Sequence, residues 1–339
     1  MFTVGPNFFS GGGGAPPVAP GSLVVGGAGS PDMRIYDPTA GFALLSNPAS
    51  PPPATIQTTA IRVAPDKSLI GFGSDASPFM KVYVASTLAA VSNPATLPTD
   101  TGRCISFSPD GQFCAVGSDG PPFINIYQVS AGPTLTKLAN PASLPSSSAA
   151  SCVWSPDGNY LALGLDVSPW VFVYQRSGTT FTKLSNPGTT PGGQVRGICF
   201  SPDGSLLVCS GNKTGGGSRF INVYSWPGFV LGAQPAVDAS GFGFGCNFNP
   251  DGTIFAATLD ASPFIERWSV SGGVFTKLSN PAVLPGGNGH DVSFSHDGVY
   301  MAVAHVGTPF VTIYTVATWA KVANPSTLPA STCNGCAWN

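Results

Sequence analysis

A unit of about 46 residues recurs along this chain, and this repeat constrains the fold more than any other feature of the sequence. Its first marker is a turn sequence, Pro-Asp-Gly or a close variant, which begins at Pro65, Pro109, Pro156, Pro202, Pro250 and His296. Its second is an aromatic-rich run, found at 33–36, 79–83, 123–127, 170–174, 220–224, 264–268 and 310–314. Its third is Asn-Pro, which the fifth unit replaces by Gln234-Pro235.

Each unit predicts four short strands. In residues 103–141 the strands are 104–108, 112–117, 122–127 and 134–138, and Asn140-Pro141 ends the last one. Pro-Asp-Gly suits the hairpin between the first two, because proline presets φ and glycine accepts a positive φ. A four-stranded sheet cannot bury both of its faces alone, but it can between two neighbours. We therefore predict an all-β, seven-bladed β-propeller with four antiparallel strands per blade.

The two ends of the repeat predict how the ring closes. Residues 20–48 supply the second, third and fourth strands of one blade, without a first strand. Residues 331–339 end in Cys-Ala-Trp-Asn, which matches the first-strand sequence Cys-Val-Trp-Ser at 152–155. We expect this C-terminal strand to complete the N-terminal blade. The predicted organisation is a Gly/Pro-rich arm at 1–19 and a propeller at 20–339.

The Phe-Ser-Pro-Asp-Gly units, each followed by a strand and an Ile-Tyr strand, resemble the WD40-like propeller superfamily over residues 20–339. The resemblance implies the propeller fold and a role in protein interactions. The Trp-Asp dipeptide of that superfamily is missing, and Tyr36-Asp37 comes closest to it. A Gly-His pair occurs once, at Gly289-His290. These departures favour a WD40-like bacterial or viral propeller, and likeness of fold alone does not assign a function.

Composition narrows the classes of partner. Charged residues are 9% of the chain and the net charge is −2, so we expect no nucleic-acid partner. The N-terminus lacks the pattern of a signal peptide, and no apolar run is long enough to span a membrane, so we expect no membrane insertion. A virion or the cytoplasm is the expected location. The eight cysteines lie mostly in the first and second strands, and we interpret them as core residues.

Catalytic chemistry has few candidates. The first strands should line the central channel, and their residues are mainly small or apolar. His290, Asp291 and His305 are weak candidates for a ligand or metal site, against the alternative that each makes a structural hydrogen bond. No nucleophile elbow or phosphate-binding loop is present. We expect no enzyme activity, no cofactor and no metal.

Departures from the repeat mark a candidate contact surface. The fifth unit carries an insertion at 212–219 with Asn212, Lys213 and Arg219, and an altered loop is followed by Phe242 and Phe244. Both should project from one face of the ring. Arg267 occupies a position that is Ile or Val in the other six units, and a buried arginine needs a partner. Lysines recur on the fourth strand, where charge opposes edge-to-edge aggregation; they are Lys137, Lys183, Lys277 and Lys321.

The N-terminal arm suggests assembly. Phe2, Phe8 and Phe9 alternate there with glycine and proline. Alone, such a segment is expected to be disordered, so we expect its own ring or a neighbouring subunit to hold it. The predicted function is a non-catalytic structural or interaction propeller, as a phage or virus-particle component anchored by this arm, with protein partners or a homo-oligomer. The alternatives are a bacterial WD40-like scaffold, a glycan-binding propeller and a lactonase-like hydrolase.

Overall fold

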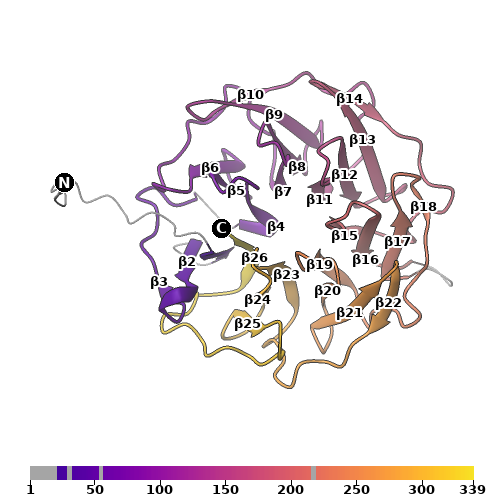
Figure 1. The fold of residues 1–339 in the computed structure, drawn as a ribbon. Coiled ribbons are helices and arrows are strands. Elements are labelled where there is room, and N and C mark those ends of the chain that lie inside the picture. Colours follow the sequence, from indigo (N-terminus) through magenta and orange to yellow (C-terminus); the bar gives the residue numbers. More distant parts are fainter. Residues whose placement is uncertain (1–20, 29–32, 53–55, 215–218) are drawn as a thin grey trace, which may run out of the picture.

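A computed structural model describes residues 21–28, 33–52, 56–214 and 219–339, with the side chains of 56–59 left aside. Within these residues the chain forms seven sheets arranged as blades around a central channel (Figure 1). The only helix of the described residues is η1 (Pro38–Ala40), a single 3-10 turn. The predicted seven-bladed, all-β propeller is confirmed.

Strand order in each blade runs from the channel outward. The first strands are β26 (Cys333–Trp338), β4 (Ile56–Val63), β7 (Gly102–Phe107), β11 (Ala149–Trp154), β15 (Val195–Phe200), β19 (Gly243–Phe248) and β23 (Gly289–Phe294). The second strands are β1 (Leu23–Gly27), β5 (Leu69–Ser74), β8 (Phe113–Ser118), β12 (Tyr160–Leu165), β16 (Leu206–Gly211), β20 (Ile254–Leu259) and β24 (Tyr300–His305). The third strands are β2 (Met33–Asp37), β6 (Met80–Val84), β9 (Ile124–Ser130), β13 (Val171–Ser177), β17 (Ile221–Ser225), β21 (Ile265–Ser271) and β25 (Val311–Thr315). The fourth strands are β3 (Ala43–Leu44), β10 (Thr134–Lys137), β14 (Thr180–Lys183), β18 (Val230–Leu231) and β22 (Val274–Lys277).

The outermost strand is reduced in two blades. In blade 2 (β4–β6) and blade 7 (β23–β25) it shrinks to a single bridge, Tyr83 with Ala90 and Tyr314 with Lys321. The third strands are also shorter than predicted. Phe79, Phe123, Trp170, Phe264 and Phe310 precede their strands, with φ of 62° to 67°. The prediction that these aromatic residues begin the strand was wrong, because a positive φ is incompatible with extended backbone.

The Pro-Asp-Gly turns form as predicted, because their side chains and backbone cooperate. Gly158 has φ of 70°, and the Asp157 carboxylate accepts a hydrogen bond from the Asn159 amide at 3.0 Å. Blade 2 carries Lys67 at the glycine position, with φ of 60°. That conformation costs an L-residue roughly 1–2 kcal/mol, so glycine is the favoured residue at this position of the repeat.

The C-terminal strand closes the ring as predicted. β26 pairs with β1 in antiparallel register, from Leu23 opposite Trp338 to Gly26 opposite Gly335. Beyond the strand, the Gly21 amide donates to the Asn339 carbonyl at 2.5 Å. Blade 1 is therefore β26, β1, β2 and β3, built from both ends of the repeat region.

The core lies between blades rather than within them. Seven apolar clusters of described residues each combine side chains from two adjacent blades, including one between blades 7 and 1. The eight cysteines are all buried and unpaired, which confirms their interpretation as core residues. Burial raises the pKa of the Cys333 thiol to about 12, so that thiol stays protonated near neutral pH. No helix among the described residues has the length and apolar character needed to cross a bilayer.

Candidate functional site at the loop face of the channel

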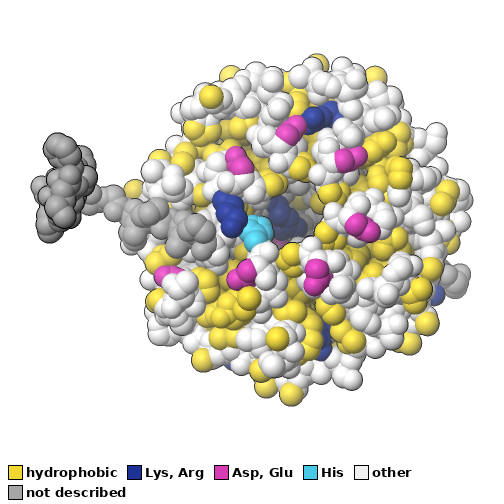
Figure 2. Space-filling model, viewed as in Figure 1, with side chains coloured by type: hydrophobic (Ala, Val, Ile, Leu, Met, Phe, Trp, Pro, Cys, Tyr) yellow, Lys and Arg dark blue, Asp and Glu magenta, His cyan; other side chains and the backbone are white. Residues whose placement is uncertain are grey.

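The channel has two chemically different mouths. Every first strand begins on the face that carries the connections between second and third strands, which we call the loop face. It ends at the opposite face, which carries the Pro-Asp-Gly turns and their variants, and we call that the turn face. Figure 2 looks onto the turn face, where acidic side chains are spaced around the opening. A first strand's second residue thus lies at the loop-face mouth, and its fifth lies nearer the turn face.

Charged residues from three blades meet at the loop-face mouth. Arg103 of β7 donates through Nε to Asp119 at 2.8 Å, and its Nη2 lies 3.5 Å from Asp166. Arg196 of β15 reaches the same Asp166 from the other side, at 3.6 Å. In the blade between them, β11 carries the buried Ala150 at the equivalent second position. These side chains remain 19–31% exposed, so they can meet a partner.

Aromatic residues continue this arrangement around the mouth. The Arg196 guanidinium lies 5.9 Å from the Phe242 ring, and Phe242 and Phe244 have centroids 4.8 Å apart. Phe244 contacts the His290 ring at 5.5 Å, and His290 Nδ1 is 2.9 Å from Asn334 Oδ1. We call this set the mouth arc; its members are Arg103, Asp119, Asp166, Arg196, Phe242, Phe244, His290 and Asn334. It offers cations, carboxylates and apolar rings along one edge.

The irregular loops of the fifth unit lie on the same face, in agreement with their prediction. Arg219 Nη2 donates to the Pro235 carbonyl, and Asp238 accepts from the amides of Phe220 and Ile221 at 3.0 and 3.1 Å. The Lys213 ammonium sits 4.3 Å from the Phe220 ring, and the Asn212 amide donates to the Gln194 carbonyl at 2.8 Å. The insertion and the altered loop therefore support one another.

The structure gives separate partners to His290, Asp291 and His305. His290 is held by Asn334, and His305 Nε2 lies 2.9 Å from the Thr312 hydroxyl. Both histidines lie in strands rather than in connections, β23 and β24, at adjacent register positions. Burial lowers the pKa of both imidazoles. No cluster of three or more His, Cys, Asp or Glu residues suited to a metal occurs in the part of the chain that is described.

Asp291 serves ring closure. It is fully buried, 3.1 Å from Arg62 Nη1, and it accepts hydrogen bonds from the Cys336 and Val292 amides at 3.2 and 3.0 Å. Burial raises the pKa of this carboxyl, and Arg62 opposes that effect. Because β26 lies between β23 and β4, the ion pair spans the closing strand. Arg62 also lines a cavity of about 310 Å³ in the channel near the turn face.

The partner of Arg267 is one the sequence did not show. Its guanidinium stacks 3.7 Å from the centre of the Trp319 ring, and Nη2 donates to the Ser279 carbonyl at 2.5 Å. Burial lowers its pKa to about 10. Glu266 turns the other way, to Lys277 at 2.6 Å. Lys137 and Lys183 are half-buried and donate to Asn140 and Asn186, so their position also holds the Asn-Pro corner.

Sequence reasoning missed the arginines of the mouth arc. Arg103 and Arg196 stand at the second position of their first strands, where the other blades carry small, aromatic or amide side chains. A comparison of that one position across the units would have found them. Phe2, Phe8 and Phe9 lie outside the described residues.

Comparison with known proteins supports the fold. The family model described as WD domain, G-beta repeat matches residues 96–120 and 183–215. No curated protein matches the chain by sequence. These two partial matches and the seven-bladed ring support a WD40-like seven-bladed propeller.

Several solved structures are similar in shape. A candidate 6-phosphogluconolactonase from Bacteroides uniformis aligns with a TM-score of 0.72 at 12% identity, covering 94% of this chain and 99% of that one. Kuenenia stuttgartiensis hydrazine synthase aligns at 0.63 and 17% identity, covering 76% of each chain. The propeller domain of Cps50 (Swd1) from Myceliophteria thermophila aligns at 0.59 and 12%, covering 80% and 88%. At these identities the similarity establishes the fold alone.

Proposed function

We propose that this propeller is a non-catalytic binding scaffold that engages a protein partner through the mouth arc. The observation that carries the proposal is the concentration of irregular residues at one mouth of an otherwise regular ring. Half-exposed arginines, carboxylates and two phenylalanines in contact lie there together. Aromatic and arginine side chains are the types enriched in protein interfaces.

Paired variants on opposite faces test this proposal. Phe242→Ser combined with Arg103→Ala should abolish retention of a partner from the native source, since both side chains are half-buried at the mouth. The matched control is Tyr160→Ser, which removes a half-buried aromatic residue from the turn face. Equal retention by both variants, with thermal melts showing folded protein, would overturn the assignment of the face.

A finer form of the proposal places the chain in a phage or virus particle, anchored by residues 1–19. Its support is the low charge of the sequence and the aromatic arm, both of which suit a packed assembly. Light scattering on the full chain beside a variant lacking residues 1–19 tests it. We expect the full chain to assemble and the shortened chain to be a monomer; two monomers would contradict the anchoring role.

A lactonase-like hydrolase is the second candidate, favoured by the shape match to the candidate 6-phosphogluconolactonase. Hydrolysis of 6-phosphogluconolactone by the purified chain is the direct test. We expect a rate equal to that of the buffer. A faster rate that His290→Ala abolishes would establish an enzyme at the loop face.

A further inference from the structure

Grooves between neighbouring blades open onto the turn face, and one of them already contains a guanidinium. In the groove between blades 3 and 4, Arg176 Nη1 donates to Asp110 Oδ2 at 2.8 Å. The same guanidinium lies 4.7 Å from the Phe113 ring and 6.0 Å from the Trp154 ring. Phe181 completes the aromatic wall, at 6.1 Å from Phe113 and 5.8 Å from Trp154.

The groove between blades 7 and 1 repeats this wall. Tyr300 takes the place of Phe113, Trp338 that of Trp154, and Phe42 that of Phe181. Tyr300 and Trp338 stack at 5.8 Å with 12° between their planes, and Phe42 packs on them at 5.4 and 6.2 Å. Asp297 stands in the turn where blade 3 has Asp110, with its carboxylate on the Ser295 hydroxyl at 2.6 Å.

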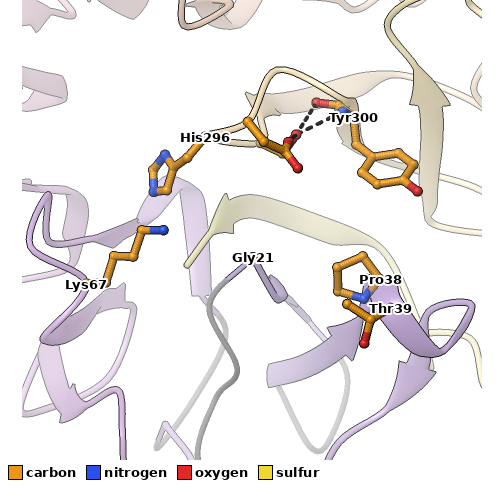
Figure 3. A pocket seen from close by; sticks show the side chains of 8 residues that line it. Gly21, Pro38, Thr39, Lys67, His296 and Tyr300 are labelled. Atoms are coloured by element: carbon orange, nitrogen blue, oxygen red, sulfur yellow. Dashed lines mark hydrogen bonds between the residues drawn. The ribbon is translucent and has the colours of Figure 1, made fainter.

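The difference lies in the residue that fills the groove. Counting two residues beyond the third-strand tyrosine, blade 4 has Arg176 and blade 1 has Pro38. Beside the short proline lies a cavity of about 350 Å³, lined by Pro38, Thr39, Asp297 and Tyr300, with Lys67 and His296 at its other end (Figure 3). In the groove between blades 4 and 5, Trp226 stands at that position and packs on Tyr160 at 4.8 Å, and a cavity of about 420 Å³ lies beside the two rings.

We propose that the groove between blades 7 and 1 binds a guanidinium group supplied by another molecule, with Asp297 as its ion-pair partner and Tyr300 as its stacking surface. This site corresponds in position to the one that Arg176 fills in the groove between blades 3 and 4. In the groove between blades 7 and 1 the chain supplies no arginine of its own at that position. The Ser295 hydrogen bond lowers the pKa of Asp297, so the carboxylate is ionised at neutral pH. A planar guanidinium combines the ion pair with stacking on an aromatic face, which an ammonium does less well.

The guanidinium could belong to an arginine with a free carboxylate or to an arginine within a polypeptide, and Lys67 distinguishes the two. Figure 3 shows Lys67 and His296 at the end of the cavity away from Tyr300 and Pro38. A free arginine, or one at a peptide C-terminus, would place its carboxylate toward Lys67. An arginine inside a polypeptide has no such carboxylate and would gain nothing from Lys67.

Calorimetric titration of the full chain with L-argininamide tests the site. We expect one saturable equivalent, and weaker binding of L-lysinamide. Asp297→Asn keeps an acceptor oxygen for the turn and should weaken binding roughly tenfold, the usual effect of losing one charge-assisted hydrogen bond. Asp251→Asn, in a turn with no such aromatic pair beside it, should leave binding unchanged.

Two further variants compare the groove between blades 7 and 1 with the groove between blades 3 and 4 in the same protein. Pro38→Arg should abolish binding, because the chain's own guanidinium would then fill the groove. Arg176→Ala should add a second equivalent by opening the groove between blades 3 and 4. No saturable binding to the wild-type chain, or unchanged affinity in Asp297→Asn, would overturn the proposal.

The same titration with L-arginine identifies the source. Tighter binding of L-arginine than of L-argininamide, with the difference erased by Lys67→Gly, indicates a ligand that carries a free carboxylate. Equal affinities indicate an arginine within a polypeptide chain. Because this groove lies on the turn face, the loop-face variants of the proposed scaffold function should leave both titrations unchanged.

Discussion

The interior of the channel and its loop-face mouth use charged residues for different purposes. Inside the channel, the buried Asp291 carboxylate pairs across the closing strand with Arg62, whose side chain is 31% exposed. At the loop face, Arg103, Asp166 and Arg196 form a half-exposed network that closes no strand. The first arrangement stabilises the ring, and the second can be given up to a partner. The chain thus uses one charged pair for structure inside the channel and presents other charged residues at the loop-face mouth.

Removing the closing strand is the largest change that the comparison allows. Deletion of residues 331–339 leaves β1 without its inner neighbour and exposes the apolar cluster between blades 7 and 1. We expect loss of the cooperative thermal transition and aggregation. A shortened chain that melts at the wild-type temperature would show that the ring does not depend on β26.

Removing the buried carboxylate is next in size. Asp291→Ala leaves the buried Cys336 amide without its acceptor and Arg62 without its ion-pair partner, and we expect a cost of about 1–3 kcal/mol in the free energy of unfolding. Chemical denaturation measures it. The control Asp119→Ala, at the loop-face mouth, should cost less than about 1 kcal/mol. Equal costs would remove the distinction between the channel interior and the mouth.

Lowering the pH should reduce the stability of the protein through the aspartates in the turns of the turn face. Hydrogen bonds from the Ser201 hydroxyl and the Ser205 amide lower the pKa of the Asp203 carboxyl below its usual value. A lowered carboxyl pKa contributes stability above the unfolded pKa, and this is lost as pH falls through the folded pKa. We expect Asp203→Asn to cost less than about 1 kcal/mol at pH 6 and to match the wild type near pH 2. If the stability difference between Asp203→Asn and the wild type grew as the pH fell, the pKa of Asp203 would be raised by folding rather than lowered.

The smallest effect on stability should come from the mouth arc itself. Arg196→Ala and Phe244→Ser should each change the free energy of unfolding by less than about 1 kcal/mol, because these side chains are half-exposed. Partner binding should still be lost. A large destabilisation would mean that the arc, like Asp291, serves the fold.

The repeat made the fold predictable, and the departures from it were harder to interpret. The turns and the closing strand follow from local residue types, so the blades and the β26–β1 pairing were correct. Strand starts were less certain, because Phe79 and its equivalents take a positive φ that aromatic composition does not reveal. The Asp291–Arg62 pair joins residues far apart in sequence. The position of the closing strand was predicted, but no sequence signal shows that these two side chains meet across it.

Candidate site residues were predicted where a loop changed length or composition, as at 212–219 and Phe242. They were missed where a single side chain changed inside a regular strand, as at Arg103. The partner of Arg267 was missed for a similar reason, since Trp319 belongs to the next blade and no sequence spacing connects the two.

The pairing of Gly21 with Asn339 means that the ring has no preferred point of entry for the chain. A circular permutant of residues 21–339 that joins these neighbours and opens the chain between two other blades keeps every sheet, and such rearrangement is tolerated where the joined ends lie close together. In that permutant the β26–β1 contact becomes local in the chain, and its closure entropy falls accordingly. The ring therefore does not require the blades to follow one another along the chain from this particular starting point.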